Sequence, residues 1–353
     1  MRERDFVLGI DTSNYTTSLA VTDRNGSIVG DSRKLLIVKQ GERGLRQSHA
    51  LFQHMENIPE LIRELFEKVD KSRIGAVAAS VRPRPVEGSY MPVFKAGVNY
   101  GKAMAAAFGV PFFEFSHQEG HLAAAVHGSG LSREREYLAY HLSGGTCELL
   151  HVTVSGEGQG DFHIKILGGS RDLSFGQVLD RIGVTLGIPF PAGGEMDLTA
   201  VKMRDKLFNR ALTGDEEGRP SCLLKEIPID GLEINLSGIE TQCRRELEKG
   251  ADREALIYEL FQKISRCLCR LTEKAVSQTG CNRVLFAGGV SASRFVRQEI
   301  GRYFNEDAAG QVKRAVQPKP VKPDLVFADP ALASDNAVGI ALLGGRRLWQ
   351  SNR

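Results

Sequence analysis

A strand–turn–strand pattern occurs twice along this chain of 353 residues. In the first copy, the apolar runs 6–10 and 17–21 flank the polar turn 11–15, and in the second the runs 137–140 and 149–152 flank a glycine-rich turn. Each copy is followed by segments with helical and strand periodicity, and a last helix is expected near the C-terminus. The sequence therefore predicts an α/β protein with two related lobes.

The composition excludes several classes of protein. Apolar residues make up 42% of the chain and charged residues 25%, which is ordinary globular usage and excludes wholesale disorder. No uncharged apolar run reaches the roughly 18 residues of a membrane span, and the charged segment 1–5 leads straight into an apolar strand, unlike a secretory signal. The net charge of +3 permits contact with nucleic acid but does not indicate it. We expect a soluble, cytoplasmic protein of about two domains.

The six cysteines include no CxxC pair, so neither a zinc ribbon nor a disulfide framework is expected. Cys267 and Cys269 lie two residues apart in a helical stretch and would point to different faces. We interpret the cysteines as buried or inert thiols.

Periodicity and turn residues predict the remaining elements. Helices are expected over 54–69, 96–108, 175–186 and 253–277, from Ser293 onward, and from Ser334 through 339. Loops are expected at 33–46, 213–219 and 312–323.

Two histidines four residues apart, His117 and His121, share one face of a helix and can reach the same metal ion. The metalloprotease motif HExxH needs Glu directly after the first His, where this chain has Gln118, so a hydrolytic zincin is disfavoured. Asp335, at the start of the expected final helix, is a candidate third ligand because carboxylates suit helix N-termini. The sequence leaves two other interpretations open: the two histidines are a chance pair in the core, and Asp335 is an ordinary helix cap.

Three glycine-containing or polar turns can present backbone N–H groups to an anion. They are the turn His141-Leu142-Ser143-Gly144-Gly145, the turn 11–15, and Gly288-Gly289 between a strand and a helix. Each alone is an ordinary tight turn, but three in a two-lobed α/β chain predict a nucleotide cleft.

Asp180 lies in an otherwise apolar helix face, four residues after Gly176. A carboxylate there can accept hydrogen bonds from ribose hydroxyls. The alternatives are a solvent-facing charge and a charge paired with its neighbour Arg181. The Pro-x-Pro-x-Gly-Gly run that ends at Gly193 and Gly194 predicts a stiff loop.

The order of these motifs resembles the TsaD/Kae/Gcp family, threonylcarbamoyl transferases that modify tRNA and were formerly named O-sialoglycoprotein endopeptidases. The matching segments are 8–13, 116–121, 142–145, 172–194, 237–241, 287–290 and 335–336. The resemblance covers nearly the whole chain. It implies an actin-like, sugar-kinase-like (ASKHA) fold with RNase-H-type subdomains, for which we assign residues 1–112 plus 334–353 to an N-terminal lobe and 113–333 to a C-terminal lobe.

The resemblance also implies a set of site residues. One iron or zinc ion would be bound by His117, His121 and Asp335, and we add Asp11 as a catalytic candidate. The adenylate substrate would be bound by His141, Leu142, Ser143, Gly144, Gly145, Asp180, Gly193, Gly288, Gly289 and Ser293.

Members of this family move a threonylcarbamoyl group from a mixed anhydride with AMP to the exocyclic amine of the adenosine next to the tRNA anticodon. An aromatic amine is a poor nucleophile, so the carbonyl must be polarised and the donor held in place. Backbone N–H groups at Gly144 and Gly145 would stabilise the departing phosphate. The resemblance thus implies a metal-dependent, acyltransferase-type enzyme that acts on tRNA, with TsaB-like and TsaE-like protein partners.

The chain departs from the family pattern at several positions. Tyr15 and Thr16 replace an acidic pair, Thr146 replaces a histidine, and Ser293 replaces an asparagine. A Gly-Pro-Gly loop becomes Arg-Pro-Arg-Pro at 82–85. These changes leave a second hypothesis: a divergent metal- and nucleotide-binding paralogue with another carbamoyl-type acceptor, or a non-catalytic partner. A third hypothesis, a sugar-kinase-like ATPase, rests on the expected architecture alone.

Overall fold

The computed structural model describes residues 3–13, 15–38, 45–155, 162–212, 222–305, 322–333 and 335–350. The chain divides into two compact units. The first is made of residues 1–135, 153–164 and 328–353, and the second of residues 136–152 and 165–327.

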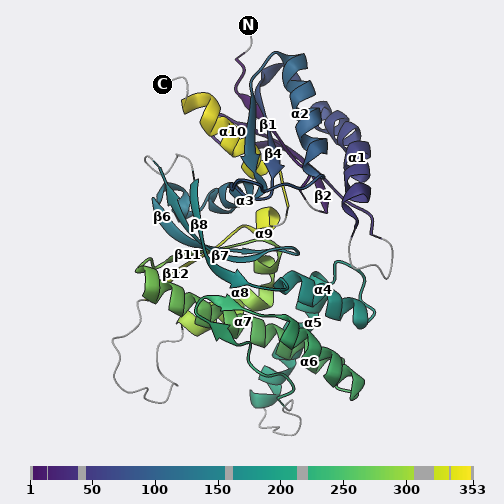
Figure 1. Cartoon of the computed structure of the whole chain (residues 1–353), viewed down its shortest axis with the longest axis vertical. Helices are drawn as coiled ribbons and strands as arrows, with labels where there is room; N and C mark the ends of the chain where they lie inside the picture. The colour runs from purple at the N-terminus through teal and green to yellow at the C-terminus, as the bar shows by residue number, and fades with distance from the viewer. Residues whose placement is uncertain are drawn as a thin grey trace. The chain divides into compact units, whose positions relative to one another are not determined.

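The first unit contains a five-stranded sheet in the order β3-β2-β1-β4-β5, of which Figure 1 labels β1, β2 and β4. The strands are β1 (Phe6–Asp11), β2 (Thr16–Asp23), β3 (Ile28–Leu35), β4 (Ile74–Arg82) and β5 (Phe112–Ser116). Strands β1, β2 and β3 pair antiparallel, whereas β4 runs parallel to both β1 and β5. Strand β1 is buried along its whole length, as expected for a strand covered on both faces.

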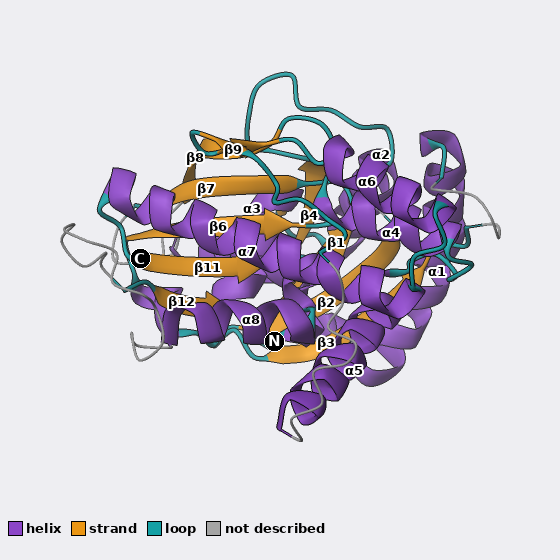
Figure 2. Ribbon diagram, turned by 90° about the horizontal axis from the view of Figure 1, so that it is seen from below, coloured by secondary structure: helices purple, strands orange, loops and turns teal. Residues whose placement is uncertain are grey.

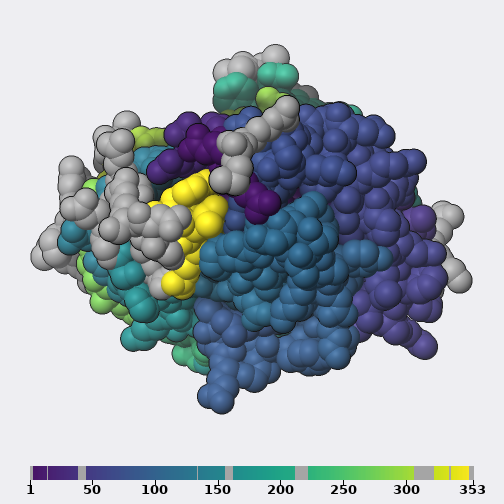
Figure 3. All heavy atoms as spheres, turned by 90° about the horizontal axis from the view of Figure 1, so that it is seen from above, coloured from purple at the N-terminus to yellow at the C-terminus, as the bar shows by residue number. Residues whose placement is uncertain are grey.

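Helices α1 and α2 cover one face of this sheet, and α3 and α10 cover the other (Figure 1). Their bounds are α1 (Gln47–Lys68), α2 (Phe94–Phe108), α3 (His117–Val126) and α10 (Val338–Gln350), with the short α9 (Pro330–Ala333) and the 3₁₀ turns η1 (Lys71–Arg73) and η2 (Gly130–Arg133). Figure 3 shows α10, in yellow, against purple and blue segments of the same unit.

Glycines allow α10 to approach its neighbours closely. A Cβ atom added to Gly339 would lie 1.8 Å from the carbonyl oxygen of Gly120 on α3, and one added to Gly9 would lie 2.5 Å from that of Ala337. Because only glycine fits such approaches, the chain just before α10 is fixed against both β1 and α3.

The second unit contains a seven-stranded sheet in the order β12-β11-β6-β7-β8-β10-β9. The strands are β6 (Glu136–Leu142), β7 (Cys147–Val154), β8 (Phe162–Ser170), β9 (Ile229–Asp230), β10 (Glu233–Ile234), β11 (Arg283–Ala287) and β12 (Asp324–Phe327). Strand β11 runs parallel to β6 and β12. The order β8-β7-β6-β11-β12 repeats the order β3-β2-β1-β4-β5, so the predicted pair of related α/β lobes is confirmed at the level of the sheets.

Helices α7 and α8 lie across one face of the second sheet (Figure 2). The helical segments of this unit are α4 (Phe175–Thr185), α5 (Gly193–Leu212), α6 (Ser237–Glu248), α7 (Arg253–Thr279), α8 (Arg294–Asn305) and the 3₁₀ turn η3 (Gly289–Ala292). The rings of Tyr140 and Phe286 stack in the core with centroids 4.8 Å apart.

Several predicted boundaries are wrong. The last helix begins at Val338 rather than Ser334, because the side chain of Asn336 accepts a hydrogen bond from the Val338 amide and caps the helix there. Gly193 and Gly194 open helix α5 rather than forming a loop. Strand β3 continues to Leu35, into the loop expected from residue 33. Residues 39–44, 213–219 and 312–321 of the expected loops lie outside the described residues.

Residues 113–135 group with the first unit, although we drew the lobe boundary at 112. Helix α3 packs on α10, so it clusters with the sheet that α10 covers. A compact unit groups residues by their contacts and need not coincide with a lobe of the fold. Our lobe boundaries therefore stay a prediction.

The cysteines are free thiols. Burial raises the pKa of Cys147, Cys243 and Cys267 to about 12, which keeps these thiols protonated and unreactive at neutral pH. None of the described helices has the length and apolarity needed to cross a membrane.

Candidate metal centre and nucleotide-binding turns

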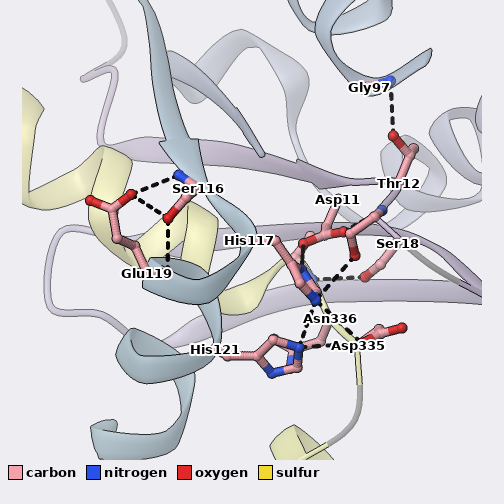
Figure 4. A network of polar contacts seen from close by, with 12 residues as sticks. Asp11, Thr12, Ser18, Gly97, Ser116, His117, Glu119, His121, Asp335 and Asn336 are labelled. Atoms are coloured by element: carbon pink, nitrogen blue, oxygen red, sulfur yellow. Dashed lines mark hydrogen bonds and ion pairs between the residues drawn. The ribbon is translucent and has the colours of Figure 1, made fainter. Parts of the chain in front are cut away.

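Helix α3 begins directly after strand β5, and a capping box fixes its first turn. The hydroxyl of Ser116 accepts a hydrogen bond from the Glu119 amide at 3.2 Å, and the Glu119 carboxylate accepts one from the Ser116 amide at 2.7 Å (Figure 4). Glu119 is therefore a structural cap. With the turn fixed, His117 and His121 project from the same side of the helix.

The two imidazoles and the carboxylate of Asp335 converge on one point in the first unit (Figure 4). The Nε2 atoms of His117 and His121 are 2.9 Å apart. The Oδ1 atom of Asp335 lies 3.2 Å from Nε2 of His121 and 3.6 Å from Nε2 of His117. The structure thus brings together the three residues that the sequence singled out, although residue 335 is far from the histidines along the chain.

Asp335 lies in a bend between α9 and α10, not in the first turn of a helix as expected. The neighbouring Asn336 holds this bend, because its amide group donates to the Leu332 carbonyl at 2.9 Å. The Ala337 amide donates to the Ser18 hydroxyl on β2 at 2.8 Å. These two anchors determine where the Asp335 carboxylate lies.

Asp11, at the end of β1, is buried with 1% exposure. Its Oδ2 atom lies 2.8 Å from Nδ1 of His117, and its Oδ1 atom accepts a hydrogen bond from the Ser13 amide at 2.8 Å. In the neutral form of His117 that carries its proton on Nδ1, this atom donates to Asp11, and Nε2 presents its lone pair toward His121 and Asp335.

The electrostatics of this cluster favour a cation. Burial alone would lower the pKa of His117, but the carboxylates of Asp11 and Asp335 raise it to about 10. Burial and the His117 charge lower the pKa of His121. Burial opposes ionisation of Asp335, yet its hydrogen bonds with the two histidines hold its pKa well below the usual range. Two carboxylates and one imidazolium leave a net negative charge in a buried place, and a metal ion bound there would displace the proton on Nε2 of His117.

The spacing of the three atoms fits a metal ion. Ligand atoms bound at about 2.0–2.2 Å in tetrahedral or octahedral geometry are separated from their neighbours by about 2.9–3.6 Å. The three separations here, 2.9, 3.2 and 3.6 Å, fall in that range. Two imidazoles and one carboxylate suit zinc or ferrous iron.

The predicted glycine-rich turns of the second unit meet through their backbones. A Cβ atom added to Gly288, after β11, would lie 2.4 Å from the carbonyl oxygen of Leu142 at the end of β6. One added to Gly176 in α4 would lie 2.7 Å from the Cα atom of Gly144. Three segments far apart in the sequence are therefore in direct contact. His141 is buried beside them at the end of β6.

Hydrogen bonds within the turn 142–145 fix its shape. The hydroxyl of Ser143 accepts from the amides of Thr146 at 2.9 Å and Gly145 at 3.2 Å, and Ser174 donates to the Gly144 carbonyl at 2.8 Å. The Gly145 amide is thus engaged inside the turn, so it is less available to a phosphate than the sequence suggested.

Asp180 on α4 contacts the segment that leads into α5. Its Oδ1 atom accepts a hydrogen bond from the Ala192 amide at 2.8 Å, next to Gly193. Burial raises the pKa of this carboxyl, which the amides of Ala192 and Gly193 partly offset. The neighbouring Arg181 bonds to Glu240 at 3.2 Å. Asp180 therefore fixes the segment that leads into α5 at Gly193.

Ser293 and Asp197 together cap helix α8. Ser293 donates to the Asp197 carboxylate, which also accepts from the amides of Arg294 and Phe295 at 3.0 Å. We did not foresee the role of Asp197 from sequence, because it lies on α5 and no local pattern links it to residue 293. Its carboxylate occupies the helix N-terminus that we expected to face a nucleotide.

This chain is similar to known proteins over most of its length. A family profile described as TsaD, tRNA N6-adenosine threonylcarbamoyltransferase, matches residues 33–341. A curated relative of that name from Halalkalibacterium halodurans is 28% identical over 353 residues, covering 96% of this chain and 90% of the relative. Another, from Sulfurihydrogenibium sp., is 30% identical over 301 residues, covering 83% of this chain and 81% of the relative.

Two solved structures share the fold at low sequence identity. HypF from T. kodakarensis aligns with a TM-score of 0.56 and 14% identity over 98% of this chain and 48% of that protein. The activator of 2-hydroxyisocaproyl-CoA dehydratase from Clostridium difficile aligns with a TM-score of 0.53 and 13% identity over 98% of this chain and 97% of that protein. The predicted actin-like, sugar-kinase-like fold class is confirmed.

Proposed function

Because this chain belongs to the TsaD family of tRNA N6-adenosine threonylcarbamoyltransferases and is an enzyme of this transferase type, we propose that its donor is threonylcarbamoyl-AMP. The acceptor is the exocyclic amine of the adenosine next to a tRNA anticodon. The bond between the carbamoyl carbon and the phosphate oxygen breaks, a carbon–nitrogen bond forms, the amine releases one proton, and AMP leaves with the electron pair of the broken bond. The observation that carries this proposal is the convergence of His117, His121 and Asp335 to within 3.6 Å in a chain of this family.

His117, His121 and Asp335 would hold one zinc or iron ion. When bound, the ion supplies Lewis acidity that polarises the carbamoyl carbonyl toward the weakly nucleophilic amine. Asp11 is a positioning residue in this proposal rather than a catalytic one, because both of its oxygens are engaged, by His117 and by the Ser13 amide. It keeps Nε2 of His117 directed at the ion.

The glycine-rich turns of the second unit would bind the adenylate. A Cβ atom added to Gly145, Gly193 or Gly289 would meet nothing within 4 Å, so there is space for a ligand beside these residues. Phosphate and ribose would approach these backbones closely, while Ser143, Asp180 and Ser293 keep the turns in shape. We propose a cytoplasmic location and TsaB-like and TsaE-like partners from family membership alone.

Mass spectrometry of tRNA nucleosides tests the reaction directly. The protein is incubated with unmodified tRNA, threonine, bicarbonate, ATP and the synthase that makes the adenylate, with and without candidate partner proteins. We expect threonylcarbamoyladenosine with the wild type and at least a hundredfold less with Asp335→Ala. If no partner combination yields the nucleoside, although the protein binds metal and AMP, the acceptor is not this adenosine.

The second candidate, a paralogue with another carbamoyl-type acceptor, is favoured by one set of observations. Tyr15 and Thr16 stand where the family has an acidic pair, and Thr16 is buried in β2. If that pair is essential to transfer, this chain should fail to complement a strain that lacks the family enzyme while still binding nucleotide. Complementation would exclude the second candidate.

A further inference from the structure

The loop between β4 and α2, residues 83–93, is anchored at both ends beside the histidine–aspartate centre. At its start, Arg82 pairs in register with Ser116, the residue before His117. The Pro83 carbonyl then accepts a hydrogen bond from the Gln118 amide at 3.1 Å.

The other end of the loop is attached to the same centre. The Thr12 hydroxyl, one residue after Asp11, donates to the Val93 carbonyl at 3.1 Å and accepts from the Gly97 amide at 3.2 Å (Figure 4). The ring of Phe94 contacts His117 edge-on, with ring centroids 6.5 Å apart. The loop therefore forms a rim of the proposed metal centre. We call this loop, together with the flanking residues Arg82 of β4 and Phe94 and Lys95 of α2, the rim loop (residues 82–95).

The rim loop exposes an unusual set of side chains. Arg82, Arg84 and Lys95 are exposed, against a single carboxylate, Glu87. Tyr90 is 60% exposed, and the ammonium group of Lys95 lies 5.9 Å from the centroid of its ring. Tyr90 offers a flat ring with the Lys95 cation beside it, and Arg82 and Arg84 are exposed on the same segment, so this surface suits a ligand that is both flat and anionic.

We propose that the rim loop binds single-stranded RNA and stacks a base of the acceptor loop on Tyr90, next to the centre where the group is transferred. The proposal rests on the function proposed above and adds the surface that recognises the acceptor. Arginine and lysine neutralise phosphates, and an aromatic ring stacks any unpaired base. An adenosine must leave its stack before its exocyclic amine can reach an enzyme centre, and a ring at the rim stabilises the unstacked form. An acidic protein segment would use the cations but not the ring.

Fluorescence anisotropy with a labelled anticodon stem-loop RNA tests this surface. We expect Arg84→Glu and Tyr90→Ala each to weaken binding at least tenfold, and Tyr90→Phe to bind as the wild type does. Arg84→Gln should reduce the slope of log affinity against log salt by about one. The matched control is Lys71→Glu, an exposed cation that precedes the nine-residue strand β4, about 30 Å from Arg82 at its far end. This control should change binding less than threefold.

The outcomes separate the surface from the reaction. If threonylcarbamoyladenosine forms but Arg84→Glu and Tyr90→Ala bind RNA as well as the wild type, the proposed RNA-binding surface is wrong and the proposed reaction is supported. If no modified nucleoside forms but RNA binding depends on the rim loop, the proposed reaction is wrong and the proposed RNA-binding surface is supported. Absence of RNA binding by the wild type, an equal loss in Lys71→Glu, or equal competition by polyglutamate would overturn the surface.

Discussion

The candidate residues of the first unit contact one another through side chains, whereas those of the second unit meet through the backbone. His117, His121, Asp335 and Asp11 form one cluster of imidazoles and carboxylates. In the second unit, Gly176 and Gly288 bring the turn 142–145 into contact with α4 and the end of β11 because they lack side chains.

This difference separates two kinds of site. A cluster of side chains supplies charge and metal ligands, and it is sensitive to any change of chemistry. A set of backbone turns supplies shape, and it is sensitive to added volume. Substitutions should therefore impair the first unit when they change a charge or a ligand atom, and the second unit when they add volume.

The largest expected effect comes from volume in the second unit. Gly288 has φ 91° and ψ 165°, a conformation open essentially only to glycine, and a Cβ there would lie 2.4 Å from the Leu142 carbonyl oxygen. Gly288→Ala should lower the free energy of unfolding by about 3 kcal/mol. The matched control is Gly289→Ala, where a Cβ would meet nothing within 4 Å. Urea unfolding should show a change below about 0.5 kcal/mol for it. Equal stability of the two variants would contradict the close contact between the turns.

In the first unit, chemistry should matter more than volume. Removal of a carboxylate that orients a metal-bound histidine commonly weakens metal affinity about 10- to 100-fold. We expect this loss for Asp11→Ala, because the hydrogen bond to Nδ1 of His117 disappears. Asp11→Asn retains an oxygen acceptor and should lose less. Competitive titration of zinc against a chromogenic chelator measures both. A metal affinity in Asp11→Ala equal to that of the wild type would remove its positioning role.

Asp180 belongs to the unit shaped by backbone turns, yet it is a carboxylate. If it also contacts ribose, Asp180→Ala should weaken AMP binding by more than about 1 kcal/mol, which is about fivefold in Kd. Asp180→Asn keeps an acceptor for the Ala192 amide, so it separates loop shape from charge. Isothermal titration calorimetry with AMP measures both variants. Unchanged affinity in both would confine Asp180 to shaping the loop.

The smallest expected effect concerns Asp172, which lies just before α4. Burial opposes its ionisation, but hydrogen bonds from the amides of Leu236, Ser237 and Leu173 hold the pKa of this carboxyl well below its ordinary value. Its stabilisation is therefore present above the unfolded pKa of about 3.9 and is lost as the pH falls through the lower folded value.

Asp172→Asn should cost about 1 kcal/mol at pH 7, and its stability should fall less on acidification than that of the wild type. Urea unfolding at pH 7 and near pH 3 provides the comparison. A parallel fall in both proteins would show that this carboxylate does not contribute.

Local patterns predicted most of the fold. The apolar runs and turns predicted β1, β2, β6 and β7, helical periodicity predicted α1, α2, α4 and α7, and the motif order indicated the fold class. Strand β8 and helices α5 and α6 were not foreseen, because their apolar spacing is weak and their stability comes from packing in the second core.

The candidate metal centre was predictable as a set of residues but not as a geometry. The spacing of His117 and His121 on one helix is a local property. The position of Asp335 is not, because it depends on the anchoring of Asn336 and Ala337 and on the close approach of α10 to α3. The role of Asp197 in capping α8 likewise arises only when α5 and α8 pack together.

Metal content of the purified protein tests the central claim most directly. Inductively coupled plasma mass spectrometry should find one equivalent of zinc or iron in the wild type, and less than a tenth of that in Asp335→Ala and His121→Ala, with all three proteins folded by circular dichroism. Full metal content in both variants, or a folded wild type that binds neither metal when each is supplied, would contradict the assignment of His117, His121 and Asp335 as a metal centre.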